Sequence, residues 1–482
     1  MIGHMESRGK SLIKFGTDGW RGVIAEDFTF ENVRFCAQGV ADYFLEMGLA
    51  EPGLVIGYDN RFASEDFAAA AAEVIAGSGI SVFLSPHSDP TPVVSFGVIH
   101  QEAAGAIAIT ASHNSARWNG FKLRMADGTS APSEVITEVE KHVTRVLGTG
   151  MVKRIPLEEA VGRGLVQYVD FRPAFLKRMA SLVDLDRLRQ TGLRVIVDPM
   201  YGPGAGYLTT LLSGGSTQVT EINSERNPAF PGINPEPIAV HLEKLSARVL
   251  HEKADVGLAL DGDADRMGVI DENGTFLTQL QVFALLCLYL LEVRGERGPI
   301  VKTITATSMV DRLGEIYGVP VHETSVGFRY VAPIMLARDA IIGGEESGGY
   351  GFRGHIPERD AVAANLHFLD FMVRTGKTPS QLLENLYRRV GPHYYHRIDV
   401  HFDEDDRRRM TEHIRENSPE AIEGVPVVKT DTYDGFRFVL ADGSWLLVRF
   451  SGTEPVLRIY AETDSMARVE RLLEVGKRLA GM

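Results

Sequence analysis

A serine with reactive neighbours stands at the end of an apolar run. Residues 106–109 read Ala-Ile-Ala-Ile, which predicts a buried strand, and Ser112 follows in Thr-Ala-Ser-His-Asn. An isolated serine at such a turn would by default cap a helix. Lys122 comes soon after, in Asn-Gly-Phe-Lys, and could transfer a proton or balance a charge. Together the two segments favour Ser112 as a nucleophile, with Lys122 as the candidate acid or base.

Three aspartates alternate in a second segment, residues 261–266, which reads Asp-Gly-Asp-Ala-Asp-Arg. Carboxylates at alternate positions of a tight turn can point at one centre, and such oxygens suit a hard divalent cation. A calcium-binding EF-hand also begins with alternating acids, but Arg266 stands where that motif needs glycine, and no helix is expected before it. Three carboxylates leave open positions that a phosphate oxygen could fill. The segment therefore predicts one Mg²⁺ with three ligands, Asp261, Asp263 and Asp265.

Two further loops offer polar groups without bulk. Residues 343–349, Gly-Gly-Glu-Glu-Ser-Gly-Gly, could accept hydrogen bonds from sugar hydroxyls, although a solvated acidic turn would read the same way. Residues 449–455, Arg-Phe-Ser-Gly-Thr-Glu-Pro, are followed by Arg458. Hydroxyls, a glycine amide and fork-shaped guanidinium donors suit phosphate oxygens, so a phosphate site is favoured over a pair of outward-facing strand residues.

All four segments follow short β-branched or apolar runs, which alternate with helical patterns for most of the chain. That alternation is typical of βα units and a mostly parallel sheet, and it restarts near residues 194 and 299. From about residue 395 strands follow one another, and a helix is expected from about residue 465. We therefore expect an α/β fold of three successive α/β domains with mixed, mostly parallel sheets, plus a smaller C-terminal α+β domain. The expected ranges are 1–165, 166–274, 275–390 and 391–482.

The bulk composition argues against several classes of protein. A length of 482 residues predicts several domains. The net charge of −14 argues against nucleic-acid or acidic-lipid partners, and no apolar run approaches the roughly 20 residues that span a bilayer. Two distant cysteines, Cys36 and Cys287, give neither a disulfide framework nor a zinc-ligand spacing. With no signal-peptide pattern at the start of the chain, a cytoplasmic location is expected.

In their order and spacing, the four segments resemble the α-D-phosphohexomutase superfamily of phosphoglucomutases and phosphomannomutases, over nearly the whole chain. The resemblance implies that Ser112 is the phosphoserine and completes the metal site of the three aspartates. It implies that Glu345 and Ser347 recognise the sugar. The phosphate-binding residues that it implies are Arg449, Ser451, Gly452, Thr453 and Arg458.

Other stretches resemble further motifs of the same superfamily. Arg21, in the opening motif Gly-Thr-Asp-Gly-Trp-Arg-Gly, corresponds to the arginine that lies near the phosphoserine. Residues 58–61 resemble the next active-site strand end, and Arg329 is expected to contact the ligand. His113 and His355 are weaker acid/base candidates than the lysine, and His355 is also expected among the substrate-binding residues.

Two departures from the superfamily pattern bear on the loop and on the substrate. Ser115 stands where the superfamily often has proline, which loosens the loop without removing the nucleophile. The sugar loop lacks the histidine of phosphomannomutase-type and phosphoglucosamine-type members, and residues 354–360 resemble the phosphoglucomutase pattern. The resemblance therefore implies glucose phosphate as the hexose phosphate. Mannose phosphate or dual specificity is the alternative, and glucosamine phosphate ranks after these.

The implied activity interconverts glucose 1-phosphate and glucose 6-phosphate, with glucose 1,6-bisphosphate as intermediate and activator, in a monomer or homodimer. A serine hydrolase would need a Gly-x-Ser-x-Gly elbow, whereas Ser112 lies between Ala111 and His113. A non-catalytic phosphosugar-binding protein is the remaining alternative. The combination of one serine, three aspartates and a lysine disfavours it.

Overall fold

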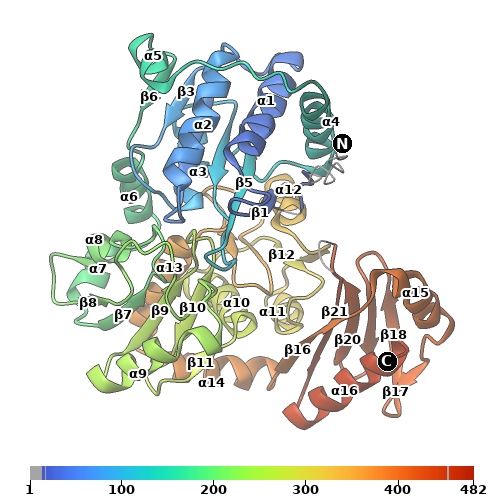
Figure 1. Cartoon of the computed structure of the whole chain (residues 1–482). Coiled ribbons are helices and arrows are strands. Elements are labelled where there is room, and N and C mark those ends of the chain that lie inside the picture. The colour runs from blue at the N-terminus through green and yellow to red at the C-terminus, as the bar shows by residue number, and fades with distance from the viewer. Residues whose placement is uncertain (1–12, 17, 453–454) are drawn as a thin grey trace.

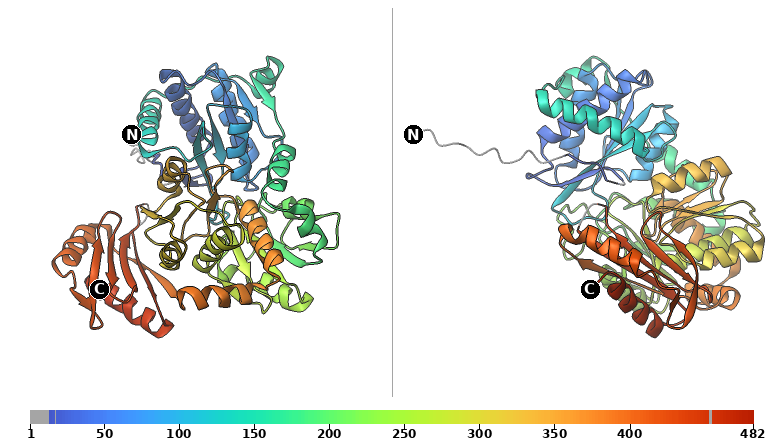
Figure 2. Two further views of the ribbon diagram at one scale, coloured as in Figure 1. Left: turned by 180° about the vertical axis from the view of Figure 1, so that it is seen from behind. Right: turned by 90° about the vertical axis from the view of Figure 1, so that its right-hand side faces the viewer.

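The computed structural model describes residues 13–16, 18–452 and 455–482, which fold around four β-sheets. Each sheet is the centre of one domain, numbered I to IV in chain order. Domains I to III form one body and domain IV stands beside it, reached through α14, Pro379–Val390 (Figures 1 and 2). Three α/β domains followed by a domain of antiparallel strands confirm the fold class predicted from the sequence.

Domain I has a six-stranded sheet in the order β1-β5-β4-β2-β3-β6. Strand β4 is buried along its whole length because helices cover both faces of the sheet, which explains its uninterrupted apolar sequence. The strands are β1 Trp20–Val23, β2 Leu54–Tyr58, β3 Val82–Leu84, β4 Gly105–Ile109, β5 Trp118–Met125 and β6 Val166–Tyr168. The helices are α1 Phe30–Glu46, α2 Ser64–Gly77, α3 Thr91–His100, α4 Ser133–Thr149 and α5 Leu157–Gly162.

Domain II has a five-stranded sheet in the order β11-β10-β9-β7-β8, in which β7, β8 and β9 are parallel and β10 and β11 are antiparallel. The strands are β7 Arg194–Asp198, β8 Gln218–Glu221, β9 Val256–Leu260, β10 Met267–Ile270 and β11 Phe276–Leu277. The helices are α6 Arg172–Ala180, α7 Leu185–Gln190, α8 Tyr207–Leu212 and α9 Glu243–Glu252. Strand β9 runs directly into the carboxylate loop, residues 261–266.

Domain III has a four-stranded sheet in the order β13-β12-β14-β15. The strands are β12 Ile300–Thr303, β13 Val321–Thr324, β14 Ile342–Gly344 and β15 Tyr350–Phe352. The helices are α10 Gln279–Leu288, α11 Met309–Tyr317, α12 Phe328–Arg338, α13 Ala361–Thr375 and α14. Helix α13 is almost wholly buried, and one hydrophobic cluster runs from Val55 through its residues to Val390. Domains I, II and III therefore share one hydrophobic cluster, in addition to smaller clusters of their own.

Domain IV has six antiparallel strands in the order β16-β21-β20-β19-β18-β17, and a hydrophobic core of its own. The strands are β16 Tyr394–His401, β17 Ala421–Ile422, β18 Val425–Asp431, β19 Phe436–Leu440, β20 Trp445–Phe450 and β21 Val456–Thr463. The helices are α15 Arg407–Glu416 and α16 Met466–Leu479, whose apolar stripe packs on the sheet. This core is separate from the cluster that domains I to III share.

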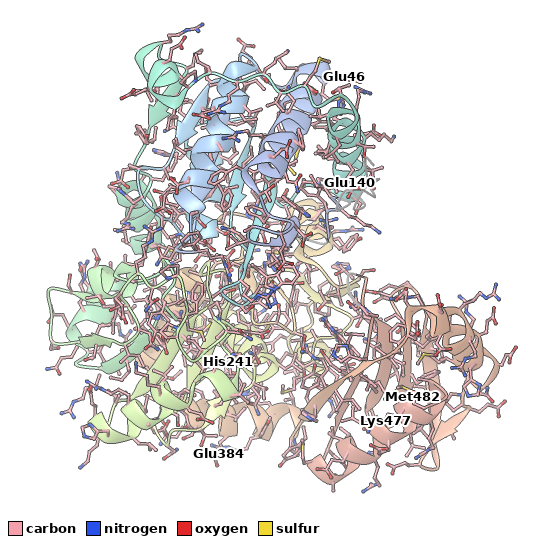
Figure 3. All side chains as sticks on the ribbon, in the orientation of Figure 1. Glu46, Glu140, His241, Glu384, Lys477 and Met482 are labelled. Atoms are coloured by element: carbon pink, nitrogen blue, oxygen red, sulfur yellow. The ribbon has the colours of Figure 1, made fainter. Side chains whose placement is uncertain are left out.

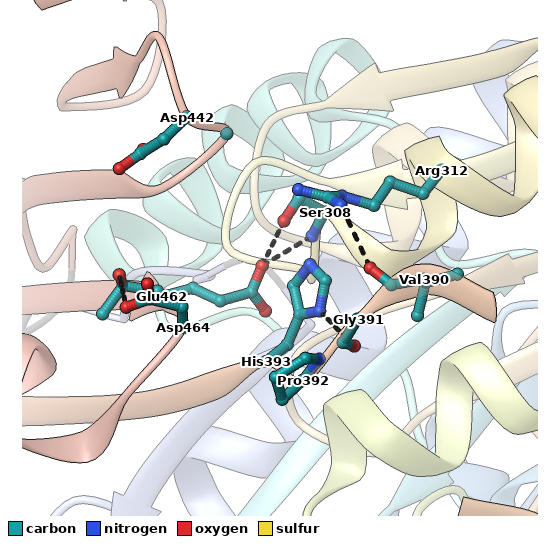
Figure 4. A pocket seen from close by; sticks show the side chains of 11 residues that line it. Ser308, Arg312, Val390, Gly391, Pro392, His393, Asp442, Glu462 and Asp464 are labelled. Carbon is teal, nitrogen blue, oxygen red and sulfur yellow. Dashed lines mark hydrogen bonds between the residues drawn. The ribbon is translucent and has the colours of Figure 1, made fainter. Parts of the chain in front are cut away.

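Polar contacts dock domain IV on domain III. Arg437 donates to the two carboxylate oxygens of Glu323 at 2.5 and 2.6 Å. At the linker, Glu462 accepts the N–H of Ser308 at 2.8 Å, at the start of α11. A cavity of about 140 Å³ lies beside that contact and is also lined by Arg312 and by linker residues 390–393 (Figure 4). The junction therefore combines specific polar pairs with an apolar cluster in which Ile304 packs on Trp445, Leu447 and Tyr460.

Charged side chains are exposed on several domains. Glu46, Glu384 and Lys477 point outward from three domains and are between 37 and 69% exposed (Figure 3). Within the described part of the chain, no helix is long and apolar enough to cross a membrane.

The sheets differ from the sequence expectations at their edges. Strands β6 and β11 complete the first and second sheets, so these sheets extend beyond the boundaries expected at 165 and 274. Both are edge strands of two or three residues, too short to leave a hydrophobic pattern. The segment that carries Lys122 is also a strand, β5, antiparallel to β4. Its alternation is masked because six of its eight residues are buried.

Candidate active site

The Ser112 loop, residues 110–117, joins β4 to β5 at the edge of the domain I sheet. Ser112 is buried and has φ of 52°, in the left-handed region that non-glycine residues seldom occupy. Its N–H donates to Thr110 Oγ1 at 2.9 Å, and its Oγ donates to Oδ2 of Asp261 at 2.9 Å. A strained backbone at a buried serine is typical of a functional site. The loop thus brings its hydroxyl against a carboxylate of domain II.

The three aspartates of the carboxylate loop are buried, and their oxygens come within 4.8 Å of one another. Asp261 Oδ1 accepts the N–H groups of Asp265 and Arg266 at 2.9 and 3.1 Å, which shapes the turn. Ala264 takes the positive φ, 57°, that the turn requires. Burial, and then the charges of Asp265 and Asp263, raise the pKa of Asp261 well above its usual value. Such crowding is stable when a cation shares the oxygens.

Some oxygens of this cluster remain without a hydrogen-bond donor. Oδ1 of Asp263 and Oδ1 of Asp265 are buried and accept no hydrogen bond from the residues that the structure describes. Buried acceptors normally have a hydrogen-bond donor, so the lack of one at these oxygens indicates that a bound ligand interacts with them. Carboxylate oxygens converging on one point are the donor set of Mg²⁺ or Ca²⁺. The residues therefore fit a divalent cation, and the buried group could bind a metal.

Lys122 reaches the same cluster from β5. Its Nζ lies 2.8 Å from Asp18, 2.8 Å from Asp263 and 3.6 Å from Asp265. Thr91 donates to the same oxygen of Asp263 at 2.6 Å. Burial would lower the pKa of Lys122, but the three carboxylates outweigh it and raise the pKa. Lys122 is therefore protonated in this arrangement, as a proton donor or a counter-charge must be.

Cationic and neutral groups surround Ser112 on its other side. The guanidinium of Arg21 donates to Oδ1 of Asn114 in the Ser112 loop. Nδ1 of His113 lies 3.4 Å from the Ser112 hydroxyl. Burial and then the positive charges of Arg266 and Arg21 lower the pKa of His113 well below its usual value, so the imidazole is neutral. These charges would attract an anionic group to the serine.

Domain III reaches the cluster through Arg359. Its guanidinium lies 2.8 Å from Asp18, 2.9 Å from Asp265 and 3.1 Å from Glu345. The side chain of Arg359 therefore links Glu345 to the carboxylate loop. Burial raises the pKa of Glu345. Ser347 is half-buried in the same turn between β14 and β15. Domains I, II and III thus contribute side chains to one place.

Two other predicted residues make interdomain contacts. Arg329 is buried at the start of α12 and donates to the carbonyl of Gly16 in domain I at 2.7 Å. His355 packs on Phe175, and its Nε2 lies 2.7 Å from Asp360, the residue that caps α13. The contacts described for His355 belong to this packing and to the helix cap.

The predicted phosphate loop is in domain IV, at the β20–β21 turn. Arg449 and Arg458 lie directly opposite each other on the two strands. Arg449 is 2.8 Å from Asp434, and Nε of Arg458 is 3.6 Å from Asp399. Like charges in opposed positions are destabilising unless anions accompany them. Among the described contacts none joins these arginines to the Ser112 cluster.

The remaining residues of that loop are small or lie outside the described part. The N–H of Ser451 donates to the carbonyl of Val456 at 2.8 Å. A Cβ at Gly452 would meet nothing within 4 Å, so open space adjoins the backbone there. Thr453 lies outside the described residues.

The sequence did not single out Asp18, Thr91 or Arg359, although each contacts the cluster. Asp18 and Arg359 lie in the motifs that contain Arg21 and His355, so the sequence marked their segments as functional without marking these two residues. Thr91 begins α3 and has no motif around it. Its contact with Asp263 depends on how domains I and II pack.

Comparisons with known proteins cover all four domains. Family models of phosphoglucomutase/phosphomannomutase match the chain as alpha/beta/alpha domain I at residues 12–147, domain II at 173–274, domain III at 279–390, and the C-terminal domain at 408–475.

Similar proteins match nearly end to end. A phosphoglucomutase/phosphomannomutase of Thermococcus kodakarensis is 31% identical over 96% of this chain and 98% of its own length. A probable phosphoglucosamine mutase of Thermococcus gammatolerans is 30% identical over 96% of this chain and 97% of its own. The crystal structure of a putative phosphomannomutase from Thermus thermophilus superposes with a TM-score of 0.84 and 34% identity, over 98% and 100% of the two chains.

Proposed function

The chain belongs to the phosphoglucomutase/phosphomannomutase family and is a phosphohexomutase, and we propose that it interconverts glucose 1-phosphate and glucose 6-phosphate through a phosphorylated Ser112. The observation that supports Ser112 is its hydrogen bond to Asp261, inside a cluster of carboxylates with orphaned oxygens.

In the proposed cycle, phosphorylated Ser112 gives its phosphoryl group to O6 of glucose 1-phosphate. The bond from Oγ to phosphorus breaks, the bond from phosphorus to O6 forms, and the proton of O6 ends on Ser112 Oγ. Lys122 is the candidate carrier of that proton, because its Nζ is buried and lies 2.8 Å from Asp263, in the same carboxylate loop as the Asp261 that accepts from the serine. The product is glucose 1,6-bisphosphate.

The second half of the cycle uses the same groups in reverse. After the bisphosphate turns over, its phosphate at C1 returns to Ser112 and glucose 6-phosphate leaves. Arg21 and His113 lie beside the serine and would steady the phosphoryl oxygens. A site that accepts both orientations of one sugar needs few, well-placed polar groups.

Mg²⁺ would be held by Asp261, Asp263 and Asp265, with an oxygen on Ser112 as a further ligand. When bound, the ion neutralises negative charge on the phosphoryl group in transfer.

Substrate binding is assigned to domains III and IV. Glu345 and Ser347 would accept hydrogen bonds from sugar hydroxyls, and Arg329 and His355 complete the proposed domain III set. The phosphate that is not reacting would bind the domain IV loop, because guanidinium, hydroxyl and glycine amide donors in that loop suit phosphate oxygens. The residues of that proposed loop site are Arg449, Ser451, Gly452, Thr453 and Arg458.

We propose glucose as the preferred sugar because of the sequences of the sugar loop, residues 343–349, and of residues 354–360. Relatives at similar identity carry phosphoglucomutase/phosphomannomutase and phosphoglucosamine mutase names, so overall similarity favours no single hexose. The loop at 343–349 lacks the histidine of the mannose and glucosamine types, which favours glucose. A coupled assay with the 1-phosphates of glucose, mannose and glucosamine tests this preference. A higher kcat/KM for mannose 1-phosphate than for glucose 1-phosphate would contradict it.

The Ser112→Ala variant tests the mechanism. We expect interconversion to be abolished while glucose 1-phosphate still binds, measured by calorimetry. The wild-type protein incubated with glucose 1,6-bisphosphate should gain a phosphate on the peptide that contains Ser112, detected by mass spectrometry. Unchanged turnover in Ser112→Ala would remove this serine from the mechanism. A wild-type protein that binds hexose phosphate without turnover would instead favour a binding protein.

A further inference from the structure

A single arginine side chain collects the backbone carbonyls of the Ser112 loop. Arg61 follows β2 and is completely buried. Its Nη1 donates to the carbonyls of Ser115 and Trp118 at 2.8 and 2.9 Å. Its Nη2 donates to the carbonyls of Ser112 and Asn114 at 2.6 and 2.5 Å. The guanidinium group thus donates four hydrogen bonds, three to carbonyls of the Ser112 loop and one to the first residue of β5.

Arg61 is itself held on both sides. Its Nε lies 3.2 Å from Asp59, whose other carboxylate oxygen accepts the N–H of Arg61 and the hydroxyl of Ser64, both at 2.9 Å. The guanidinium also lies over the ring of Phe230 in domain II, 5.0 Å from its centre. Beside it, Asn60 donates to the carbonyl of Tyr201 at 2.7 Å. The segment therefore fixes the serine loop relative to domain II, which carries the carboxylates.

This arrangement dictates how the loop peptides face. In a trans peptide the C=O and N–H groups point to opposite sides. Because Arg61 gathers the carbonyls of Ser112 and Asn114, the N–H groups of His113 and Ser115 point away from it. The same contacts hold Ser112 at its strained φ of 52°, which persists only where the surroundings enforce it.

We propose that Arg61 is the positioning residue that holds the Ser112 loop in register for phosphoryl transfer. The proposal rests on the proposed function of Ser112 as the group that accepts and donates phosphate. Arg61 acts through the loop backbone and through its anchorage on domain II. A point charge cannot do the same, because lysine lacks the planar fork that reaches four carbonyls.

The test compares Arg61→Met and Arg61→Lys with the wild type and with Arg294→Met. Arg294 is a fair control because it also donates to a backbone carbonyl, that of Leu182 at 3.0 Å, but it lies partly buried after residues 289–293 and has no described contact with the Ser112 loop. The first measurement is the rate at which glucose 1,6-bisphosphate phosphorylates Ser112, followed by intact mass under single-turnover conditions. Steady-state kcat and KM for glucose 1-phosphate are measured on the same samples, per folded molecule by circular dichroism and thermal melting.

In Arg61→Met we expect the phosphorylation rate and kcat to fall about 100-fold, since a loop shift near 1 Å costs about that much. KM should change by less than about threefold, because binding groups in domains III and IV are untouched. Arg61→Lys should lie between that variant and the wild type, and it supplies the result if Arg61→Met does not fold. Arg294→Met should melt earlier yet keep its kcat.

If the folded Arg61 variants were phosphorylated at the wild-type rate, the inference about Arg61 would be overturned and the proposed function of Ser112 would stand. Loss of activity in proportion to the unfolded fraction would do the same, since it would show a purely structural role. If the wild-type protein takes no phosphate on Ser112, the proposed function falls and the inference falls with it.

Discussion

Replacing Gly262 with alanine is expected to force the Ser112 loop and the carboxylate loop apart. A Cβ at Gly262 would overlap the carbonyl oxygen of Ser112 and lie 2.9 Å from Cγ of Pro235. Carbon atoms in contact normally lie about 3.5–4.0 Å apart, so the two chains must separate by roughly 1 Å. The hydrogen bond from Ser112 to Asp261 crosses the same gap. The substitution therefore lengthens the link between the serine and the metal ligands.

The expected magnitude follows from that displacement. A misplacement of about 1 Å between reacting groups can cost about 100-fold in rate, so kcat should fall by about two orders of magnitude. Overpacking of this size usually costs about 1–3 kcal/mol, which should leave a protein with a large shared core folded. We therefore expect a folded protein with little activity.

The assay couples formation of glucose 6-phosphate from glucose 1-phosphate to a dehydrogenase, with Mg²⁺ in excess. Gly148→Ala is the matched control, because Gly148 lies in α4 and an added Cβ there meets nothing within 4 Å. That variant should keep the wild-type kcat. A folded Gly262→Ala protein whose kcat stays within about threefold of the wild type would refute the reasoning.

Three further predictions concern the metal, pH and domain docking. Asp263→Asn should weaken Mg²⁺ binding by at least about tenfold in calorimetry, whereas Asp255→Asn, outside the cluster, should not. Burial raises the pKa of Asp198 to about 6, so its stabilising contribution is present below pH 4 and is lost as pH rises through 6. The gain in unfolding free energy from Asp198→Asn should therefore grow by about 2 kcal/mol between pH 4 and 7 in urea titrations, and a constant difference would contradict it. Glu323→Gln leaves Arg437 short of a partner at a cost of about 1–3 kcal/mol, so proteolysis between α14 and β16 should accelerate; an unchanged cleavage rate would exclude Glu323 as a docking contact.

Local chemistry could be predicted from the sequence because it depends on neighbouring residues. The apolar run before Ser112 and the alternation of Asp261, Asp263 and Asp265 are local patterns, and the strands they predict, β4 and β9, are present. The four-domain fold was also predictable, since strand and helix periodicities leave a trace at every restart. Family membership, inferred from the order of the motifs, is confirmed by the match of all four domain models.

Only the tertiary structure decided which distant residues meet. Nothing in the sequence indicates that Thr91 donates to Asp263, or that one arginine, Arg61, gathers the carbonyls of a loop more than fifty residues away. Strands β6 and β11 likewise become visible only by pairing with their sheets. Periodicity reports how a residue sits on its own element, whereas these contacts arise from the packing of one element or domain against another. Local sequence patterns therefore determined the type of chemistry, whereas the packing of residues distant in sequence determined the geometry of the site.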